Sequence, residues 1–365
     1  MLIDIIAGAR PNFMKIAPII EELRAIKAKG VNVDYRLVHT GQHYDRAMSG
    51  NFFEQLGIPH PDINLEVGSG TQAQQTARIM ERYESVLLEN PAHLCMVVGD
   101  VTSTMACSIA AKKLNISVAH VEGGIRSGDM TMPEEVNRMV TDSITDYFFT
   151  TSETANANLR KSGVADNRIF FVGNTMIDTL LKNMSRLEKP EIWGKEKLQS
   201  QKYYTLTLHR PANVDDEKSL KGLIEEISKG AEELPVIFPV HPRTAKNLEK
   251  IGVDYPNIIM TEPMGYLQFI YLVKNTRAVI TDSGGITEEA TVLGVPCMTL
   301  RDSTERPETV TVGTNELLGI KPEAVGPAFE RLKRGEWKKG EIPELWDGKT
   351  AQRIVEHILN LYNLY

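Results

Sequence analysis

The chain of 365 residues contains only three cysteines, Cys95, Cys107 and Cys297. They are far apart, and no Cys-x-x-Cys pair is present. This spacing excludes a disulfide framework and a cysteine-based zinc or redox site. Because each cysteine falls within an expected core element, we expect all three to be buried and to behave as small apolar side chains.

Long apolar runs and a surplus of positive charge are also missing. No run approaches the roughly 18 residues of a membrane span, and residues 1–4 show neither a basic region nor a cleavage pattern. We therefore expect a cytoplasmic protein with no membrane association. The net charge of −7 argues against nucleic acid as a partner. An anionic ligand would need a local basic pocket.

The first βα turn lacks a dinucleotide-binding fingerprint. An apolar strand at residues 2–6 runs into Ala-Gly-Ala-Arg-Pro and then into a helical stripe, without the pattern G-x-G-x-x-G. Dinucleotide binding is therefore disfavoured. No spacing of His, Asp and Glu predicts a metal site either. The sequence predicts neither a cofactor nor a metal.

What the chain does contain is a strand–helix–strand unit at residues 94–121 that organises the rest. The apolar run 94–98 ends in Gly99-Asp100, residues 102–113 have helical periodicity, and the run 116–121 ends in Glu122. Such crossovers are right-handed, so both strands should end at one edge of a parallel sheet, where α/β proteins bind ligands. Glu134 and Glu135 follow at a helix start. We expect these carboxylates to converge, to raise each other's pKa and to handle protons.

Further βα units extend this pattern along the whole chain. We expect strands near residues 33–38, 63, 147–150, 169–172, 203–208, 236–240, 258–260, 278–281 and 297–300, with helices between them. A polar stretch at 187–202 separates two such series. The fold class is therefore α/β, with two Rossmann-like domains facing across a cleft. We place the first domain at 1–185, the second at 186–349 and a final helix at about 350–365.

Cations and glycines mark two places suited to phosphate. Arg10 and Lys15 lie at the start of the first helix, where the helix N-terminus already favours anions. In the second domain the strand 278–281 ends in Asp-Ser283-Gly284-Gly285 before a helix expected at 286–293. These glycines would let backbone amides approach a diphosphate. His209 and Arg210, after the strand 203–208, would add a cationic pair.

Glu288 and Glu289 are expected in the first turn of that helix. A carboxylate there could accept hydrogen bonds from both hydroxyls of a ribose. The alternative is that the acidic pair merely complements the helix dipole.

Together these motifs resemble one known family along nearly the full chain. They are GARPNFMKIAP (8–18), TGQHYD (40–45), GDVTST (99–104), HVEGGIRSGD (120–129), MPEEVNR (132–138), GNTMID (173–178), TLHRPAN (207–213), TDSGGITEEA (281–290) and TLRDSTERPETVTVGTN (299–315). They resemble the non-hydrolysing UDP-N-acetylglucosamine 2-epimerases of bacteria and archaea. The resemblance implies a GT-B-like fold, UDP held mainly by the C-terminal domain, and a C-terminal helix that packs back on the N-terminal domain. It also implies a homodimer without a cofactor and a role in cell-surface polysaccharide synthesis.

Carried over by position, the resemblance assigns the individual residues. Those implied to be catalytic are Asp100, Glu122, Glu134 and His209. Those implied to bind the diphosphate, sugar, ribose or uracil are Arg10, Lys15, Arg138, Leu267, Phe269, Ser283, Gly284 and Glu289. Arg210 and Gly285 are added as binding residues from the residue pattern described above. Which carboxylate is the base and which the acid does not follow from the sequence.

The implied reaction inverts C2 of the sugar in UDP-N-acetylglucosamine (UDP-GlcNAc) to give UDP-N-acetylmannosamine (UDP-ManNAc). In family members UDP leaves by anti elimination to give 2-acetamidoglucal, and syn re-addition follows with a proton on the opposite face. Such chemistry needs acid–base carboxylates and a cationic site for the departing diphosphate. The residue types named above fit both needs.

Departures from the family pattern leave alternatives open. Residues 42–45 read Gln-His-Tyr-Asp where several bacterial members have Gln-His-Arg-Glu in a segment that contributes to an activating second UDP-GlcNAc site. Relatives with the present pattern include 2-epimerases of modified UDP-2-acetamido sugars such as diacetamido uronic acids. A hydrolysing epimerase that releases free ManNAc, a GT-B glycosyltransferase and a catalytically silent nucleotide-sugar-binding protein are the other hypotheses.

Overall fold

The computed structural model describes residues 1–41, 57–240, 242–252 and 254–364, and only the backbone of residues 10, 11, 242 and 243. The chain divides into two compact units, Met1–Lys182 together with Glu344–Tyr365, and Asn183–Pro343. Sequence analysis places these boundaries at residues 185/186 and 349/350. The departing segment 42–45 lies outside the described residues.

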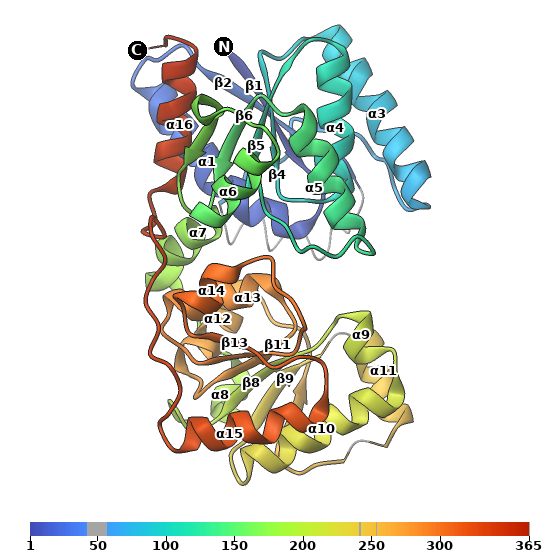
Figure 1. Cartoon of the computed structure of the whole chain (residues 1–365), viewed down its shortest axis with the longest axis vertical. Helices are drawn as coiled ribbons and strands as arrows, with labels where there is room; N and C mark the ends of the chain where they lie inside the picture. The colour runs from blue at the N-terminus through green and yellow to red at the C-terminus, as the bar shows by residue number, and fades with distance from the viewer. Residues whose placement is uncertain (42–56, 241, 253, 365) are drawn as a thin grey trace. The chain divides into compact units, whose positions relative to one another are not determined.

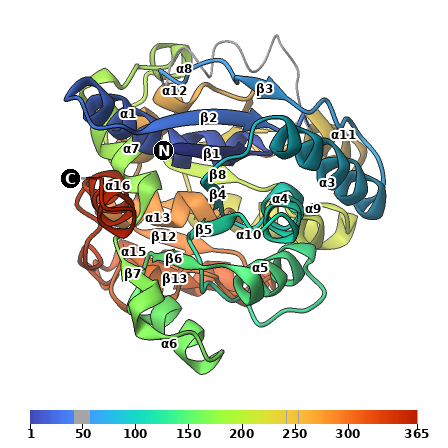
Figure 2. The same ribbon diagram turned by 90° about the horizontal axis from the view of Figure 1, so that it is seen from above.

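The first unit is built on a parallel sheet of seven strands, in the order β3-β2-β1-β4-β5-β6-β7. In the view of Figure 2 the strands follow this order from β3 at the top to β7 at the bottom. The strands are β1 (Leu2–Ala7), β2 (Asp34–His39), β3 (Ile63–Asn64), β4 (Leu94–Val98), β5 (Ser117–Val121), β6 (Tyr147–Thr150) and β7 (Ile169–Phe171).

Helices cover both faces of this sheet. They are α1 (Arg10–Ala28), α3 (Gln72–Glu89), α4 (Thr102–Lys113), α5 (Pro133–Ile144), α6 (Glu153–Lys161), α7 (Thr175–Asn183) and α16 (Thr350–Leu361), with a 3₁₀ turn at Asp166–Arg168. Helices α3, α4 and α5 pack side by side on one face, and α1 packs against α16 on the other (Figures 1 and 2). The last helix of the chain thereby belongs to the first unit. Its stripe of Ile354, Ile358 and Leu359 is buried there.

The second unit repeats the design with a parallel sheet in the order β10-β9-β8-β11-β12-β13. Its strands are β8 (Tyr204–Thr207), β9 (Val236–Pro239), β10 (Ile258–Thr261), β11 (Val279–Thr281), β12 (Cys297–Thr299) and β13 (Asn315–Leu317). Its helices are α8 (Glu191–Lys195), α9 (Pro211–Val214), α10 (Glu217–Ala231), α11 (Pro242–Lys250), α12 (Tyr266–Asn275), α13 (Gly284–Val292), α14 (Pro307–Thr311) and α15 (Val325–Lys333), with 3₁₀ turns at Met184–Arg186 and Pro322–Ala324. Strand β13 is absent from the sequence-based expectation, because three half-polar residues carry no apolar run.

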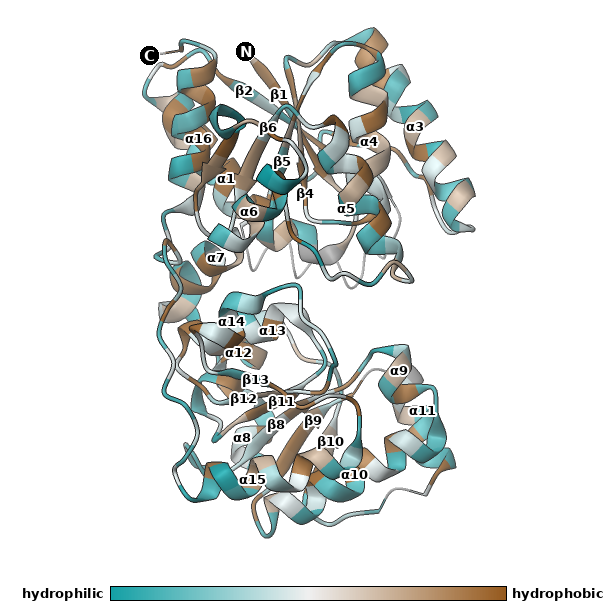
Figure 3. Ribbon diagram, in the orientation of Figure 1, coloured by the Kyte–Doolittle hydropathy of each residue, from teal (hydrophilic) through white to brown (hydrophobic). Residues whose placement is uncertain are grey.

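The cores follow the period-2 alternation of buried strands. Along β8, Tyr204 and Leu206 face a cluster formed with α10 and α15, whereas the preceding Tyr203 faces a different cluster with Leu272. Figure 3 shows the apolar residues concentrated on the strands and the hydrophilic ones on outer helix surfaces. All three cysteines are free and buried, which confirms the expectation for them. Burial raises the pKa of the Cys297 thiol to about 12, so it is inert as a nucleophile.

Both sheets have the Rossmann strand order. The first three strands of each unit are added toward one edge of the sheet, and the fourth and later strands are added toward the other edge. The predicted fold class, two Rossmann-like α/β domains of GT-B type, is therefore confirmed. In such sheets ligands bind beyond the carboxyl ends of the strands at this switch point. It lies between β1 and β4 in the first unit and between β8 and β11 in the second. In the part of the chain that the structure describes, no helix is long and apolar enough to cross a bilayer.

Candidate active site

In the first unit, two predicted carboxylates lie at the ends of neighbouring strands beside the switch point. Val98 of β4 pairs with Val121 of β5, so Asp100 and Glu122 follow at the same edge of the sheet. The Gly99 amide donates to the Val121 carbonyl at 3.0 Å, and the Glu122 amide donates to the Phe149 carbonyl at 2.8 Å. These bonds extend the sheet past its last paired residues and fix the backbone from which both side chains project.

Glu122 is paired with Lys15 of α1. The Nζ–Oε2 distance is 2.7 Å, and the two side chains are only 15% and 3% exposed. Glu122 also has a φ of +70°, a left-handed conformation that is uncommon for a residue with a Cβ. Such strain persists where the surrounding structure imposes it, and functional sites are its usual place. The turn thus holds the Glu122 carboxylate against a nearly buried cation.

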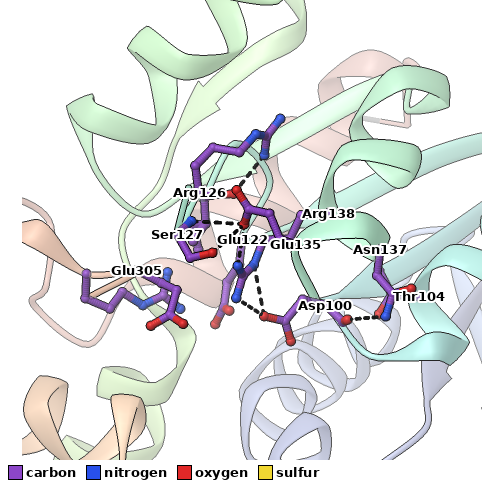
Figure 4. A network of polar contacts seen from close by, with 12 residues as sticks. Asp100, Thr104, Glu122, Arg126, Ser127, Glu135, Asn137, Arg138 and Glu305 are labelled. Atoms are coloured by element: carbon purple, nitrogen blue, oxygen red, sulfur yellow. Dashed lines mark hydrogen bonds and ion pairs between the residues drawn. The ribbon is translucent and has the colours of Figure 1, made fainter. Parts of the chain in front are cut away.

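Asp100 is paired with Arg138 of α5. The guanidinium donates from Nη2 at 2.5 Å and from Nε at 3.0 Å to the same Asp100 oxygen (Figure 4). Asn137 donates to the Asp100 carbonyl at 2.8 Å, so one helical turn holds both the backbone and the side chain of Asp100. The Asp100 side chain remains 32% exposed. It can therefore still meet a ligand.

The acidic pair at the start of α5 divides into two roles. Glu135 is buried and accepts from Arg138 at 2.7 Å and from the Ser127 and Gly128 amides at 2.9 and 3.0 Å (Figure 4). Burial raises the pKa of Glu135, but these hydrogen bonds outweigh burial and leave the pKa below its ordinary value. Glu134 is half-buried and forms no hydrogen bond or ion pair with the described residues.

The expectation that neighbouring carboxylates raise each other's pKa is therefore wrong for Glu135. The reason is that a cation separates the acidic groups. Arg138 lies between Glu135 and Asp100, and Lys15 pairs with Glu122. These residues are far apart in the sequence, at positions 15, 100, 122 and 138. Only the fold therefore shows which cation pairs with which carboxylate.

The turn after β1 is tied to the same edge by Asn12. Its Oδ1 accepts from the Gly8 and Ala9 amides at 3.2 and 2.9 Å, and its Nδ2 donates to the Val98 carbonyl at 3.0 Å. This buried asparagine sets the backbone leading to α1, on which Lys15 lies. The side chain of Arg10, predicted to bind the diphosphate, is outside the described part of the chain.

In the second unit, Asp282 organises the segment after β8. Fully buried at the end of β11, it accepts from the His209 and Arg210 amides at 3.0 and 2.9 Å and from Asn213 at 3.1 Å. The His209 ring adds a contact from Nδ1 at 2.8 Å while its side chain stays 56% exposed. Burial raises the pKa of Asp282, but His209 and the other donors outweigh it, and the net shift is downward. An ionised Asp282 thereby orients His209 with Nε2 directed away from it.

Arg210 is largely occupied by the protein itself. Its Nε donates to the Asp282 carbonyl at 3.0 Å, and its Nη2 lies 3.8 Å from Glu305. Glu305 also forms a two-pronged pair with Arg301 at 2.7 and 2.8 Å. Burial opposes ionisation of Glu305, but Arg301 and Arg210 lower its pKa to about 2. Sequence reasoning missed Arg301 and Glu305, because they lie in a loop where a spacing of four residues does not predict an ion pair.

The glycine segment begins the helix sooner than expected. Helix α13 starts at Gly284 with Ser283 as its N-cap, so both glycines are helical and the acidic pair lies beyond the first turn. The expected start at 286 is wrong because Gly284 and Gly285 adopt ordinary helical geometry. The Ser283 amide donates to Thr281 Oγ1 at 2.9 Å. The amides of Gly284 and Gly285 are first-turn donors without an acceptor within the helix.

Glu289 is deeply buried and held by a tyrosine that sequence reasoning did not single out. The Tyr266 hydroxyl of α12 donates to Glu289 Oε1 at 2.9 Å. Burial raises the pKa of Glu289 to about 8, with the tyrosine bond opposing the shift and the nearby Glu288 charge adding to it. Glu288 instead pairs with Arg306. In the same helix as Tyr266, Leu267 is a core residue at 2% exposure and Phe269 is half-buried.

This buried carboxyl group predicts a pH dependence of stability. Below about pH 4.5 Glu289 is protonated in both states; between 4.5 and about 8 only the unfolded chain ionises it, so the free energy of unfolding falls as pH rises. We expect Glu289→Gln, which cannot ionise, to lose less stability than the parent between pH 5 and 8.5 in urea unfolding. Exposed Glu323→Gln is the control and should follow the parent. Parallel curves for Glu289→Gln and the parent would contradict the assignment.

Within the described residues, no three His, Cys, Asp or Glu side chains are grouped to hold a metal ion. The polar groups described above instead suit acid–base work in the first unit and anion binding in the second.

Comparisons with known proteins identify the family. The family model described as UDP-N-acetylglucosamine 2-epimerase matches residues 24–359. A UDP-N-acetylglucosamine 2-epimerase of Methanocaldococcus jannaschii is 42% identical, over 97% of this chain and 98% of that protein. A UDP-2,3-diacetamido-2,3-dideoxy-D-glucuronate 2-epimerase of Pseudomonas aeruginosa is 37% identical, over 99% and 100%.

A solved structure agrees with the sequence comparisons. The crystal structure of the M. jannaschii UDP-GlcNAc 2-epimerase in complex with UDP-GlcNAc and UDP superimposes with a TM-score of 0.87 at 42% identity, covering 99% of this chain and 100% of that one. The chain therefore belongs to the UDP-N-acetylglucosamine 2-epimerase family.

Proposed function

We propose that this protein interconverts UDP-GlcNAc and UDP-ManNAc by inverting C2 of the sugar. The observation that carries the proposal is the pair of acids Asp100 and Glu122, each beside its own cation at the switch point of the first sheet. Its support from relatives is the 42% identity to an archaeal protein named UDP-N-acetylglucosamine 2-epimerase.

In the proposed reaction the first unit acts on the sugar. One carboxylate removes the C2 proton while the bond between C1 and the diphosphate oxygen breaks, giving 2-acetamidoglucal and UDP. A second acid then returns a proton to the opposite face of C2 as the diphosphate oxygen adds again to C1. Asp100, Glu122 and Glu134 are the acids proposed for these transfers. Lys15 and Arg138 hold the side chains of Glu122 and Asp100 in place.

The second unit is proposed to hold the nucleotide and the departing charge. His209, oriented by Asp282, and the first-turn amides of α13 supply donors to the diphosphate, and Arg10 is proposed to add a guanidinium. The buried Glu289, aligned by Tyr266, is proposed to accept from the ribose hydroxyls. Because the Leu267 side chain is in the core, a contact of this segment with uracil would come from its backbone or from Phe269.

Gly284 offers a sharp test of nucleotide binding. Among the residues that the structure describes, a Cβ built there would meet only the Arg301 and Glu305 side chains, at 3.8 and 4.0 Å, which leaves room for a methyl group. We expect Gly284→Ala to fold with unchanged or slightly higher stability, by up to about 1 kcal/mol. UDP affinity should fall by about tenfold or more, because the methyl group would occupy the approach to the amides. Isothermal titration with UDP beside a melting curve measures both, and normal UDP affinity would contradict the proposed diphosphate position.

The function itself is tested with purified protein and UDP-GlcNAc in D₂O, without an acceptor, followed by NMR. We expect UDP-ManNAc to appear and deuterium to enter C2 of both nucleotide sugars. Free ManNAc with UDP would indicate the hydrolysing reaction instead. An unchanged substrate without deuterium would overturn the proposal.

A second candidate substrate is favoured by one comparison. The P. aeruginosa relative named for UDP-2,3-diacetamido-2,3-dideoxy-D-glucuronate is 37% identical over the full length of both chains. The same assay with that uronic acid separates the two: exchange at C2 with it alone would assign the protein to modified UDP-sugars.

A further inference from the structure

Beneath the two carboxylate-bearing turns lies a buried histidine that neither the motifs nor the proposed mechanism uses. His120 is in β5, two residues before Glu122, and its side chain is 1% exposed. Its Nδ1 lies 2.7 Å from Oδ1 of Asp142, and its Nε2 lies 2.8 Å from the carbonyl oxygen of Gly99. Both ring nitrogens are therefore engaged at short distances.

The two partners define the state of the ring. A backbone carbonyl can only accept, so Nε2 must carry a hydrogen. Asp142 also accepts from the Gly124 amide at 3.1 Å and from Arg126 at 2.6 Å. Burial raises the pKa of Asp142, but the bonds and charges of His120 and Arg126 bring it below its ordinary value. The Nδ1 atom and Asp142 Oδ1, 2.7 Å apart, share one hydrogen within the pair.

The bonds of this pair end on the two turns of the proposed site. The Gly99 carbonyl belongs to the peptide that joins Gly99 to Asp100. The N–H of Gly99 itself already donates to the Val121 carbonyl. With His120 on the carbonyl, the Gly99 residue, which has a φ of +70°, is held from both sides. On the other side, Asp142 holds the Gly124 amide, two residues after Glu122.

The glycines around the ring show how tightly it is enclosed. A Cβ at Gly123 would lie 2.9 Å from the Phe148 ring and 3.3 Å from His120 Nδ1. One at Gly124 would lie 2.5 Å from the Ala155 carbonyl. A Cβ at Gly99 would reach 3.4 Å from Lys15 Nζ and 3.9 Å from Glu122 Oε2, so the Gly99 turn packs directly on that ion pair. A small movement of His120 would therefore pass to both carboxylates.

We propose that His120 is a positioning residue, held between Asp142 and the Gly99 carbonyl, that fixes the turns presenting Asp100 and Glu122. It touches no substrate and acts through these two residues. The inference rests on the proposed function, because the positions of Asp100 and Glu122 matter for turnover only if they carry the chemistry. The hydrogen on Nε2, however, can be detected without any substrate.

The first test is NMR of the full chain with ¹⁵N-labelled histidine at pH 7.5, assigned by the signal lost in His120→Gln. We expect Nε2 of His120 to show a bonded hydrogen in the free protein, because its partner is a carbonyl oxygen. An Nε2 without a bonded hydrogen would overturn the proposal. This readout is independent of epimerase activity, so it remains decisive if the proposed function fails.

The second test compares two amide replacements. In His120→Asn the amide nitrogen can take the place of Nδ1 and keep the bond to Asp142 but not the bond to Gly99. In His120→Gln the amide nitrogen can take the place of Nε2 and keep the bond to Gly99. We expect kcat to fall by about 10²-fold in His120→Asn, as for catalytic groups displaced by about 1 Å. His120→Gln should lose less, and KM should change less than twofold in both variants.

The matched control is His357→Gln. This half-buried histidine of α16 packs on Phe170 at a ring distance of 4.6 Å in the same unit. It calibrates the activity change caused by lost packing alone. If His120→Asn and His120→Gln lose kcat equally and no more than His357→Gln, the positioning role is wrong. If the parent shows no C2 exchange while the NMR result holds, the proposed function fails and the bond from His120 Nε2 to the Gly99 carbonyl stands.

Discussion

Glu122→Gln is expected to lower turnover of the sugar nucleotide by about 10³-fold, within the range for loss of a general acid–base group. In the parent, Lys15 Nζ lies 2.7 Å from Glu122 Oε2. The glutamine amide has nearly the same size, and its oxygen can still accept a hydrogen bond from Lys15. It cannot take or give a proton at C2. The rate of deuterium entry at C2 measures the loss directly, and UDP affinity, which we assign to the second unit, should change less than twofold.

Asp100→Asn and Glu134→Gln extend this test to the other proposed acids. The exposed Glu153→Gln of α6 is the control for loss of one negative charge in the same unit. Near-normal turnover in Asp100→Asn, Glu122→Gln and Glu134→Gln together would rule out the acid–base assignment. The neighbour Glu135→Gln separates the two acids of α5: because Glu135 is buried on Arg138, this change should lower the melting temperature, whereas Glu134→Gln should leave it unchanged.

Asp4→Asn is expected to give the largest loss of stability. Asp4 is fully buried in β1 and accepts from Arg36 Nε and Nη2, each at 2.7 Å, and from the Tyr83 hydroxyl at 2.9 Å. Breaking a buried ion pair by removing one charge leaves the other uncompensated and costs about 3 kcal/mol or more. For a unit of this size that corresponds to a fall in melting temperature of about 6–12 °C.

Asp34→Asn is the matched control for Asp4→Asn. Asp34 pairs with Lys27 at 2.7 Å, the same distance, but both side chains are 53% exposed. Because surface ion pairs contribute about 0–1 kcal/mol, the melting temperature should shift by at most about 4 °C. Calorimetry of the two variants compares the melting-temperature shift from a buried ion pair with that from an exposed one, the two aspartates lying on the neighbouring strands β1 and β2. Equal shifts would show that Arg36 and Tyr83 find other partners when Asp4 is changed.

Several positions at the site were predicted from local pattern alone. The strands before Asp100 and Glu122 are apolar runs of five or six residues, and their order along the chain fixes the edge at which both acids emerge. The helix after Asp100, expected at residues 102–113, has these bounds in the structure. At residues 284 and 285 the sequence predicted a turn, because glycine is common in turns. In the structure both glycines are helical.

The sequence by itself determined the α/β class, the two series of βα units and the motifs that connect the chain to its family, because these depend on local apolar periodicity and on residue order. Only the tertiary structure decided that Lys15 meets Glu122 across 107 positions and that Arg138 meets Asp100 across 38. It also placed His120 between Asp142 and Gly99. Such pairings depend on how strands and helices that are distant in sequence pack together in space. A local sequence pattern does not specify which distant residues come into contact.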